Sequence, residues 1–276
     1  MQTIKEYGYL ACYSEQHIGA TIKFSKKFPD KILASFDWFH HHDDAKYNIY
    51  IQCEPPSMWK DRMKLLEPHK NKYDLFLGYQ KEILELDNSQ FFLPVAGWIN
   101  PPYNINKLPQ ISFFTSNKLN TKDHKFRFEV WEFMKNRHCI NDLYYKFWRS
   151  PPYANSETRN SFYIDSMFNI ACENEVMDNG FSEKLIDCFS CKTVPIYYGC
   201  TNIDEFFNPK GILTFRTIEE FDDIINSIDK KLYESMLPYI EENYELSKPY
   251  WQKTVYQRLE DLITEKYYSN ERWIKL

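Results

Sequence analysis

The sequence predicts an α/β protein made of two lobes. Short apolar runs of strand length alternate along the chain with longer amphipathic runs of helical periodicity, which is the pattern of α/β folds. The 276 residues, 43% of them hydrophobic, are enough for one large domain or two small ones with a sizeable core. A Pro- and Asn-rich segment, INPPYNINKLPQ at 99–110, divides the chain and predicts a linker.

The individual elements follow from local patterns. Candidate strands are short apolar runs rich in β-branched and aromatic residues, and they are Tyr47–Cys53, Tyr73–Tyr79, Ile111–Ser116, Met167–Cys172, Thr193–Tyr198 and Gly211–Phe215. Candidate helices carry apolar residues at intervals of three and four, and they are Thr121–Asn136, Glu183–Cys191, Ile218–Ile228, Tyr233–Tyr244 and Tyr250–Tyr268. A second segment, WRSPPYANSETRNS at 148–161, is expected to be irregular.

These elements place an N-terminal lobe at 1–105 and a C-terminal lobe at 109–249. The final segment, 250–276, is rich in Tyr, Trp, Lys and Glu, and we expect it to pack back on the N-terminal lobe. A weak peripheral contact of this segment with a membrane is the alternative, although its acidic residues argue against a strongly cationic face. If two α/β lobes face a cleft, ligands bind at the carboxyl ends of the strands.

The composition excludes several classes of function. The net charge of −5 argues against a nucleic-acid partner, and the 7 glycines form no Gly-rich phosphate loop. We find no apolar run of signal-peptide length at the N-terminus and no window of about 18 apolar residues that could span a membrane. The 7 cysteines are irregularly spaced, which indicates reduced thiols. We therefore expect a soluble cytoplasmic protein without a transmembrane segment.

Two clusters have some features of metal or redox sites. Cys188 and Cys191 have C-x-x-C spacing, but no second pair completes a zinc site, and both fall within an amphipathic pattern. We interpret them as packed core residues, with a redox role as the alternative. The histidines at 40–42 precede Asp43 and Asp44, and adjacent residues rarely converge on one ion. We interpret this segment as a solvated loop and predict no metal site.

The stretch NGFSEKLIDCFSCKTVPIYYG, at 179–199, carries the main functional signal. Ser182 is a good N-cap for a helix whose first turn contains Glu183 and Lys184. A strand, a loop and a helix start in this order often bind an anion, because the free N–H groups and the helix dipole favour negative charge. A lysine in the first turn opposes the dipole, so either an anionic ligand or simple solvation must explain Lys184. Glu183 could accept hydrogen bonds from ligand hydroxyls.

A longer segment around this stretch, FNIACENEVMDNGFSEKLIDCFSCKTVPIYYG followed by FFNP, strongly resembles the signature of the α1,3-fucosyltransferase family. That signature contains an F-x-x-x-F-E-N strand, a variable loop, Y-[IV]-T-E-K, a helix and an x-P-[IV]-x-x-G strand. Other segments resemble family segments in the same order: IYIQCEPPSMW at 49–59, YDLFLGYQKEI to FFLPV within 73–95, and ISFFTSN to RFEVWEFMKN within 111–136. The resemblance extends over the greater part of the chain.

The resemblance implies an inverting glycosyltransferase, similar to glycosyltransferase family 10, with the GT-B fold of two Rossmann-like lobes facing a cleft. The C-terminal lobe would bind the nucleotide-sugar donor, GDP-fucose in the family, and the N-terminal lobe a glycan acceptor. Such enzymes need no metal held by Asp-x-Asp, and the sequence contains no Asp-x-Asp. No metal or other cofactor is therefore expected beside the co-substrate, so cations and backbone N–H groups must neutralise its pyrophosphate.

The resemblance also implies roles for individual residues. Glu54 matches the catalytic base, and its apolar neighbours Pro55, Pro56 and Trp59 predict a raised pKa; the alternative is a surface glutamate before a turn. Arg127 matches an arginine that contacts the donor phosphates, which a planar guanidinium can grip in pairs. The alternative for Arg127 is a basic residue on a solvated helix face.

The E-K segment supplies the other predicted donor-binding residues. Lys184 would face the diphosphate, and Glu183 would face sugar or ribose hydroxyls. Glu173 and Asn174 match the family's E-N pair and would border the nucleotide or hold the loop. Phe181 replaces the usual tyrosine, which keeps a stacking surface and removes a hydroxyl.

Departures from the family pattern keep two alternatives open. Met167 stands where the family commonly has lysine, so one cation near the donor is expected to be missing. Together with Phe181, this leaves a donor such as UDP-xylose or another GDP-sugar as an alternative. Only 53 residues precede Glu54, so the N-terminal lobe is expected to lack an element of a full Rossmann lobe. A non-catalytic glycan-binding protein with the same architecture is the second alternative.

Overall fold

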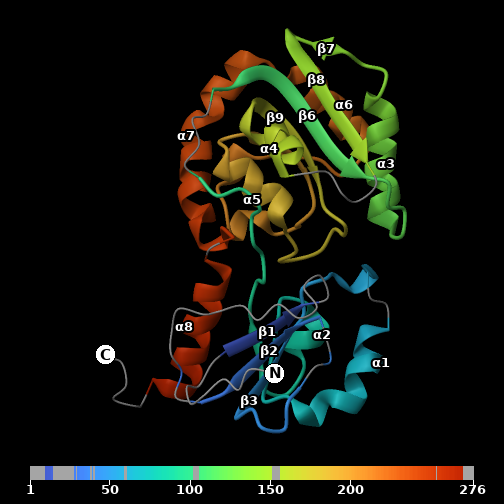
Figure 1. Ribbon diagram of the computed structural model, residues 1–276. Coiled ribbons are helices and arrows are strands. Elements are labelled where there is room, and N and C mark those ends of the chain that lie inside the picture. The colour runs from blue at the N-terminus through green and yellow to red at the C-terminus, as the bar shows by residue number, and fades with distance from the viewer. Residues whose placement is uncertain are drawn as a thin grey trace. The chain divides into compact units, whose positions relative to one another are not determined.

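The computed structural model describes residues 10–14, 28, 30–37, 39, 41–58, 61–101, 106–150, 156–252 and 254–269. The chain divides into two units (Figure 1): unit 1 comprises Met1–Pro94 and Val255–Leu276, and unit 2 comprises Val95–Thr254. The boundary between Pro94 and Val95 lies before the predicted linker at 99–110, because residues 95–99 contact unit 2. Gly97 bridges Trp251, and its N–H donates to the Tyr250 carbonyl at 2.8 Å. Residues 102–105 of the predicted linker lie outside the described residues.

Unit 1 contains a parallel sheet in the sequential order β1-β2-β3-β4-β5. Its strands are β1 (Leu10–Ser14), β2 (Ile32–Phe36), β3 (Tyr47–Ile51), β4 (Leu75–Gly78) and β5 (Ser89–Phe91). The middle strands are apolar without alternation and almost fully buried, as is typical of a parallel sheet covered on both faces. The short stretch before Glu54 thus supplies two strands in addition to β3.

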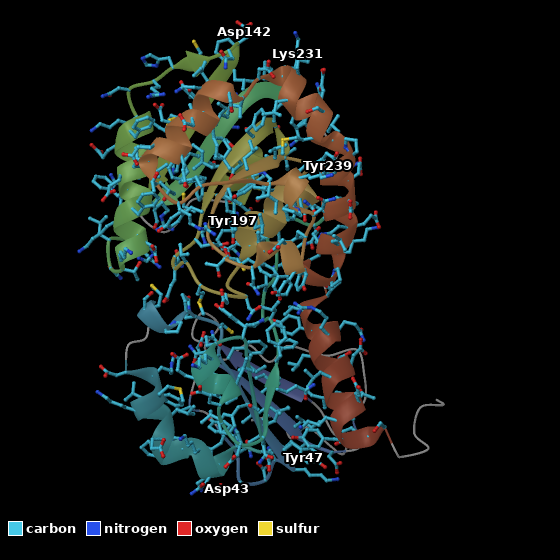
Figure 2. All side chains as sticks on the ribbon, turned by 180° about the vertical axis from the view of Figure 1, so that it is seen from behind. Asp43, Tyr47, Asp142, Tyr197, Lys231 and Tyr239 are labelled. Carbon is cyan, nitrogen blue, oxygen red and sulfur yellow. The ribbon has the colours of Figure 1, made fainter. Side chains whose placement is uncertain are left out.

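The helices of unit 1 are short, except the last. They are α1 (Arg62–Leu66), α2 (Lys81–Leu84), the 3₁₀ turns η2 (Pro56–Met58) and η3 (Glu67–Lys72), and α8 (Val255–Tyr268). The end of α8 lies beside the start of β3 (Figure 2), where the rings of Tyr47 and Tyr267 stack with centroids 3.9 Å apart. The Tyr268 hydroxyl donates to Asp30 at 2.9 Å. This helix starts five residues later than Tyr250, because η6 (Lys248–Tyr250) and Trp251 belong to unit 2.

Unit 2 contains a sheet in the order β11-β10-β9-β6-β8-β7, parallel except for β7. Its strands are β6 (Leu108–Ser116), β7 (Cys139–Ile140), β8 (Leu143–Ser150), β9 (Ser166–Cys172), β10 (Val194–Tyr198) and β11 (Leu213–Thr214). The four strands predicted for this lobe are all found, with shifted ends. Every residue of β9 and β10 is buried, so these two strands form the centre of the core.

Helices cover both faces of this sheet (Figure 1). On one face lie α3 (Lys122–Met134) and α6 (Ile218–Ser227), with Trp131 of α3 packed near Phe113 of β6. On the other lie α4 (Ser156–Ile164), α5 (Glu183–Ser190) and α7 (Lys230–Ser247), with Tyr233 of α7 edge-on to Phe168 of β9. The short turns η4 (Ile203–Glu205) and η5 (Pro209–Gly211) connect β10 to β11.

The prediction that 148–161 is irregular is wrong at both ends. Strand β8 continues to Ser150, and α4 begins at Ser156, while residues 151–155 lie outside the described residues. The α4 sequence SETRNSFYI has no recognisable helical periodicity, because only Phe162 and Tyr163 are buried and they form no apolar stripe. Contacts with the sheet, rather than local periodicity, therefore stabilise this helix.

The strand order of unit 2 creates a topological switch point. After β6, the chain passes through α3 to β8 on one side of β6, and then through α4 to β9 on the other side. In such doubly wound sheets, ligands bind outside the carboxyl ends of the two strands at which the order reverses. Here these ends are Ser116 of β6 and Cys172 of β9.

Candidate anion-binding site

Arg127 lies at this switch point with its positive charge buried. The residue is 4% exposed, projects from α3, and donates from Nη1 to Asn174 Oδ1 at 3.0 Å and from Nη2 to Ser116 Oγ at 3.3 Å. Both partners are neutral, and no carboxylate forms an ion pair with Arg127 within the described part of the chain. Burial lowers the pKa of Arg127 below its ordinary value, but a guanidinium keeps its proton in proteins. The carboxylates of Glu173 and Glu183 interact with this charge only at longer range. Burying a cation without a directly bonded carboxylate is costly, and an anion bound to the guanidinium would offset that cost.

His124 and Asn174 fix the position of this arginine. Thr121 is the N-cap of α3, and its side chain accepts from the His124 N–H, while its own N–H donates to His124 Nδ1 at 3.3 Å. His124 Nε2 lies 3.1 Å from Asn174 Oδ1, which also accepts from Arg127. Burial, with a smaller contribution from the Arg127 charge, lowers the pKa of His124 to about 4, so the imidazole is neutral.

Glu173 fixes the start of α5. Its carboxylate accepts from the Ser182 N–H at 2.9 Å, from the Ser182 hydroxyl at 2.6 Å and from Lys184 Nζ at 3.4 Å. Ser182 in turn caps the helix by accepting from the Lys184 N–H at 3.3 Å, as predicted. Because Glu173 is only 4% exposed and both its oxygens are occupied, its contacts favour a positioning role over direct contact with a ligand.

Lys184 is oriented by two carboxylates. Nζ lies 3.2 Å from Glu183, 3.4 Å from Glu173 and 3.1 Å from the Ser182 hydroxyl, which occupy its three N–H groups. Burial by itself lowers the pKa of Lys184, but the two carboxylates outweigh it, and the pKa lies above its ordinary value. Lys184 therefore stays charged, and a phosphate must replace one of these partners to contact it. Glu183, whose side chain is 20% exposed against 5% for Glu173, is the partner that can move.

The two residues that depart from the family pattern, Phe181 and Met167, are both buried. The Phe181 ring is 3% exposed and packs edge-on against Phe206, Phe207 and Tyr250, so its contacts favour a core role over the predicted stacking on a ligand. Met167 is buried near the start of β9. The five residues from Met167 to the carboxyl end of that strand span about 16 Å at about 3.3 Å per residue. A lysine at position 167 would not reach the switch point along this strand, so the expected loss of a cation there does not follow.

Glu54 lies in unit 1, at the carboxyl end of β3, on a backbone that is fixed from two sides. Asp37 accepts from the N–H groups of Cys53 at 2.9 Å and Glu54 at 3.2 Å. The Glu54 carbonyl accepts from the side-chain amides of Gln52 at 2.8 Å and Gln80 at 3.1 Å. The Glu54 side chain thus starts from a rigid loop, as a positioned general base requires. Its raised pKa remains a prediction, and Trp59 lies outside the described residues.

Sequence patterns did not reveal three residues that build these loops. Asp37 has a positive φ of 58°, and burial raises the pKa of its carboxyl group above the ordinary value. Asp187 of α5 is fully buried and accepts from the N–H groups of Trp98 at 2.8 Å and Ile99 at 3.0 Å; burial raises its pKa to about 8. His124 is the third of these residues. A histidine three residues after a threonine cap could have indicated a capping box, although Glu or Gln is usual there.

The cysteine pair belongs to the core, as predicted. Cys188 and Cys191 are both fully buried, and burial raises the pKa of both thiols. A redox role requires an accessible thiolate of low pKa, so these features argue against it. Within the described ranges, no group of three or more His, Cys, Asp or Glu residues could hold a metal ion. In the histidine segment, His42 pairs with Asp44 at 3.6 Å, while His40 lies outside the described residues.

Comparison with known proteins identifies what the chain is similar to. No protein-family profile matches it. The α-(1,3)-fucosyltransferase FucT of Helicobacter pylori is 32% identical over 91 residues, which are 33% of this chain and 19% of that enzyme, so the match spans about a fifth of the relative. A crystal structure of an α1,3-fucosyltransferase with GDP-fucose is similar with a TM-score of 0.54 and 15% identity, over 95% of this chain and 92% of that chain. The resemblance to the α1,3-fucosyltransferases is confirmed.

Other structures with similar folds are also glycosyltransferases. TarM has a TM-score of 0.56 and 12% identity, over 84% of this chain and 54% of that chain. Sucrose-phosphate synthase from Thermosynechococcus elongatus has a TM-score of 0.53 and 7% identity, over 85% and 73%. These neighbours have the GT-B fold, so the two α/β units correspond to its two Rossmann-like lobes, as predicted. Among the described residues, no helix is both long and apolar enough to cross a membrane.

Proposed function

We propose that this α1,3-fucosyltransferase-like protein is an inverting glycosyltransferase that transfers fucose from GDP-fucose to a hydroxyl group of a glycan. The observation that carries the proposal is Arg127, a buried cation at the switch point of unit 2 whose hydrogen-bond partners Asn174 and Ser116 are both neutral. The N-terminal ends of α3 and α5 are both fixed by side-chain caps, and Lys184 adds a second cation at the start of α5. This set of donors and positive charges suits a nucleoside diphosphate.

The proposed chemistry is a direct displacement. Glu54 removes the proton from an acceptor hydroxyl, and the oxygen attacks the anomeric carbon from the face opposite the nucleotide. The bond between that carbon and the diphosphate oxygen breaks at the same time, and GDP leaves with the electron pair. Arg127 and Lys184 stabilise the negative charge on the departing diphosphate. Glu183, once released from Lys184, accepts hydrogen bonds from sugar or ribose hydroxyls.

A donor panel tests this proposal. The purified chain is incubated with GDP-fucose, GDP-mannose, UDP-xylose or UDP-galactose, together with galactose- or glucosamine-containing acceptors, and free nucleoside diphosphate is measured. GDP-fucose is expected to give the highest kcat/KM, with a β-to-α inversion in the product. If nucleoside diphosphate is released only from a UDP-sugar, the proposed donor is wrong, but the proposed transfer reaction stands. Glycan binding without release from any donor would support the non-catalytic alternative and overturn the proposal.

We also propose that the reaction needs no metal ion, because the positive charges of Arg127 and Lys184 can offset the diphosphate. The rate is then expected to be unchanged in excess EDTA.

We propose a cytoplasmic location; the cysteines at 53, 139, 172, 188, 191 and 200 are free thiols, which suits a reducing compartment. The Tyr268 and Tyr267 contacts of α8 within unit 1 support packing of this helix rather than a membrane contact. Fractionation of the source cells would test both statements.

A further inference from the structure

We propose that His124 is a positioning residue for the donor diphosphate, acting through Asn174 on Arg127. This inference rests on the proposed function for the identity of the ligand, but its geometric basis does not. The tautomer of His124 sets the orientation of Asn174, and Asn174 in turn holds Arg127.

The tautomer of His124 follows from its backbone contact. Thr121 donates its N–H to His124 Nδ1 at 3.3 Å, so this nitrogen must carry a lone pair. In a neutral imidazole the hydrogen then resides on Nε2, which lies 3.1 Å from Asn174 Oδ1. His124 is fully buried on α3, and burial lowers its pKa to about 4, so it does not add a proton near neutral pH. His124 is therefore a donor toward Asn174.

The orientation of Asn174 follows from its two donors. Oδ1 receives hydrogen bonds from His124 Nε2 and from Arg127 Nη1 at 3.0 Å, which use both lone pairs of the amide oxygen. The backbone carbonyl of Asn174 accepts from the Thr121 hydroxyl at 3.0 Å, so the main chain is fixed to the same helix start. Because Oδ1 accepts from these two donors, the other amide atom, Nδ2, points away from them and can donate an N–H to a ligand.

The neutral partner at position 174 matters for binding because it keeps the positive charge of Arg127 available to a ligand. A carboxylate at position 174 would hold Arg127 equally well but would cancel its charge. The neutral amide, oriented by a neutral imidazole, holds the guanidinium in place without adding a negative charge in contact with it. Only the longer-range interaction with Glu173 and Glu183 then competes with an anion for the Arg127 charge. His124 thus belongs to the site although it need not touch the ligand, and it also caps α3.

Two substitutions separate the positioning role from the cap. In His124→Asn the side-chain oxygen occupies the place of Nδ1 and keeps the cap, but nothing replaces Nε2. In His124→Gln the longer amide supplies a nitrogen at the place of Nε2, and Gln is a usual residue at this position of a capping box. Thr217→Ala is a matched control, because Thr217 caps α6 by accepting from the Glu220 N–H at 3.2 Å and its loss destabilises unit 2 without touching the site.

Isothermal titration with GDP, together with thermal melting, provides the first test. His124→Asn is expected to raise the Kd for GDP about tenfold, as the loss of one hydrogen bond predicts. His124→Gln is expected to restore the wild-type Kd, and Thr217→Ala is expected to lower Tm without changing Kd. A His124→Asn variant with wild-type affinity would overturn the inference. So would a Kd that follows Tm across all three variants, because that is the behaviour of a purely structural residue.

Nitrogen-15 NMR of the histidine side chains, in the protein without ligand, provides the second test. The NMR signals of His124 are assigned as those that are missing in His124→Gln. Between about pH 6 and pH 8 they are expected to show the neutral tautomer with hydrogen on Nε2. The opposite tautomer, or a protonated ring, would overturn the inference. Failure of the proposed function has a different signature: wild-type protein that shows the expected tautomer but does not bind GDP.

Discussion

Replacing Asn174 with aspartate adds one negative charge beside Arg127 with almost no change of shape. The new carboxylate would take the place of the Oδ1 atom that lies 3.0 Å from Arg127 Nη1 and 3.1 Å from His124 Nε2. Charge centres about 4 Å apart attract by about 4 kcal/mol at an effective dielectric constant of about 20. Arg127 would gain a carboxylate in direct contact, in addition to the longer-range interaction with Glu173 and Glu183. Asn174→Asp is therefore expected to leave the free energy of unfolding unchanged or to raise it.

Ligand affinity is expected to move in the opposite direction. A diphosphate on the far side of the guanidinium would lie about 8 Å from the new carboxylate, and each of its charges would be repelled by about 2 kcal/mol at the same dielectric constant. The Kd for GDP is therefore expected to rise about 30-fold or more. Calorimetric titration with GDP and urea unfolding measure the two quantities on the same sample.

The matched control is Asn226→Asp, which makes the same charge change at an exposed position of α6. The Asn226 carbonyl accepts from Asn141, which lies just before β8 at the amino edge of the sheet, whereas the site lies at the carboxyl edge. The Kd is expected to stay within about twofold of the wild-type value, since distant exposed charges are largely screened at 0.1 M salt. Equal affinity for GDP in Asn174→Asp and in wild-type protein would refute the view that the Arg127 charge is held available for an anion.

Three further predictions concern other parts of the chain. Glu54→Gln is expected to lower kcat by about 10²–10⁴ while leaving the Kd for GDP unchanged; near-normal turnover would remove Glu54 as the base. Because burial raises the pKa of Asp187 to about 8, the native state binds more protons than the unfolded state between about pH 4 and pH 8, so stability falls as pH rises. Urea unfolding should show a slope of up to about 1.4 kcal/mol per pH unit, which Asp187→Asn abolishes; equal slopes would contradict this account. Cys188 and Cys191 are expected to resist iodoacetamide until the chain unfolds, and rapid labelling of native protein would restore the redox alternative.

The parts of the site that the sequence predicts are those built from neighbours along the chain. Ser182 as cap, with Glu183 and Lys184 in the first turn, follows from residue types at successive positions, and the helix begins as predicted. The centre of the C-terminal lobe was equally predictable, because β9 and β10 are buried apolar runs bounded by helices.

The parts that it does not predict depend on contacts between distant segments. The bond between Arg127 and Asn174 joins residues 47 positions apart, and the bond of Trp98 to Asp187 joins residues 89 positions apart. No local pattern predicts which polar groups meet across the carboxyl edge of a sheet. For the same reason the sequence does not predict that the Glu173 and Glu183 carboxylates both contact Lys184 in the protein without ligand.

The most direct test of the central claim is a crystal structure of the chain with bound GDP. Diphosphate oxygens are expected within hydrogen-bond distance of the Arg127 guanidinium, with Lys184 Nζ released from Glu183 and turned toward the same oxygens. A diphosphate that is well ordered elsewhere, with Arg127 still bonded only to Asn174 and Ser116, would contradict this claim.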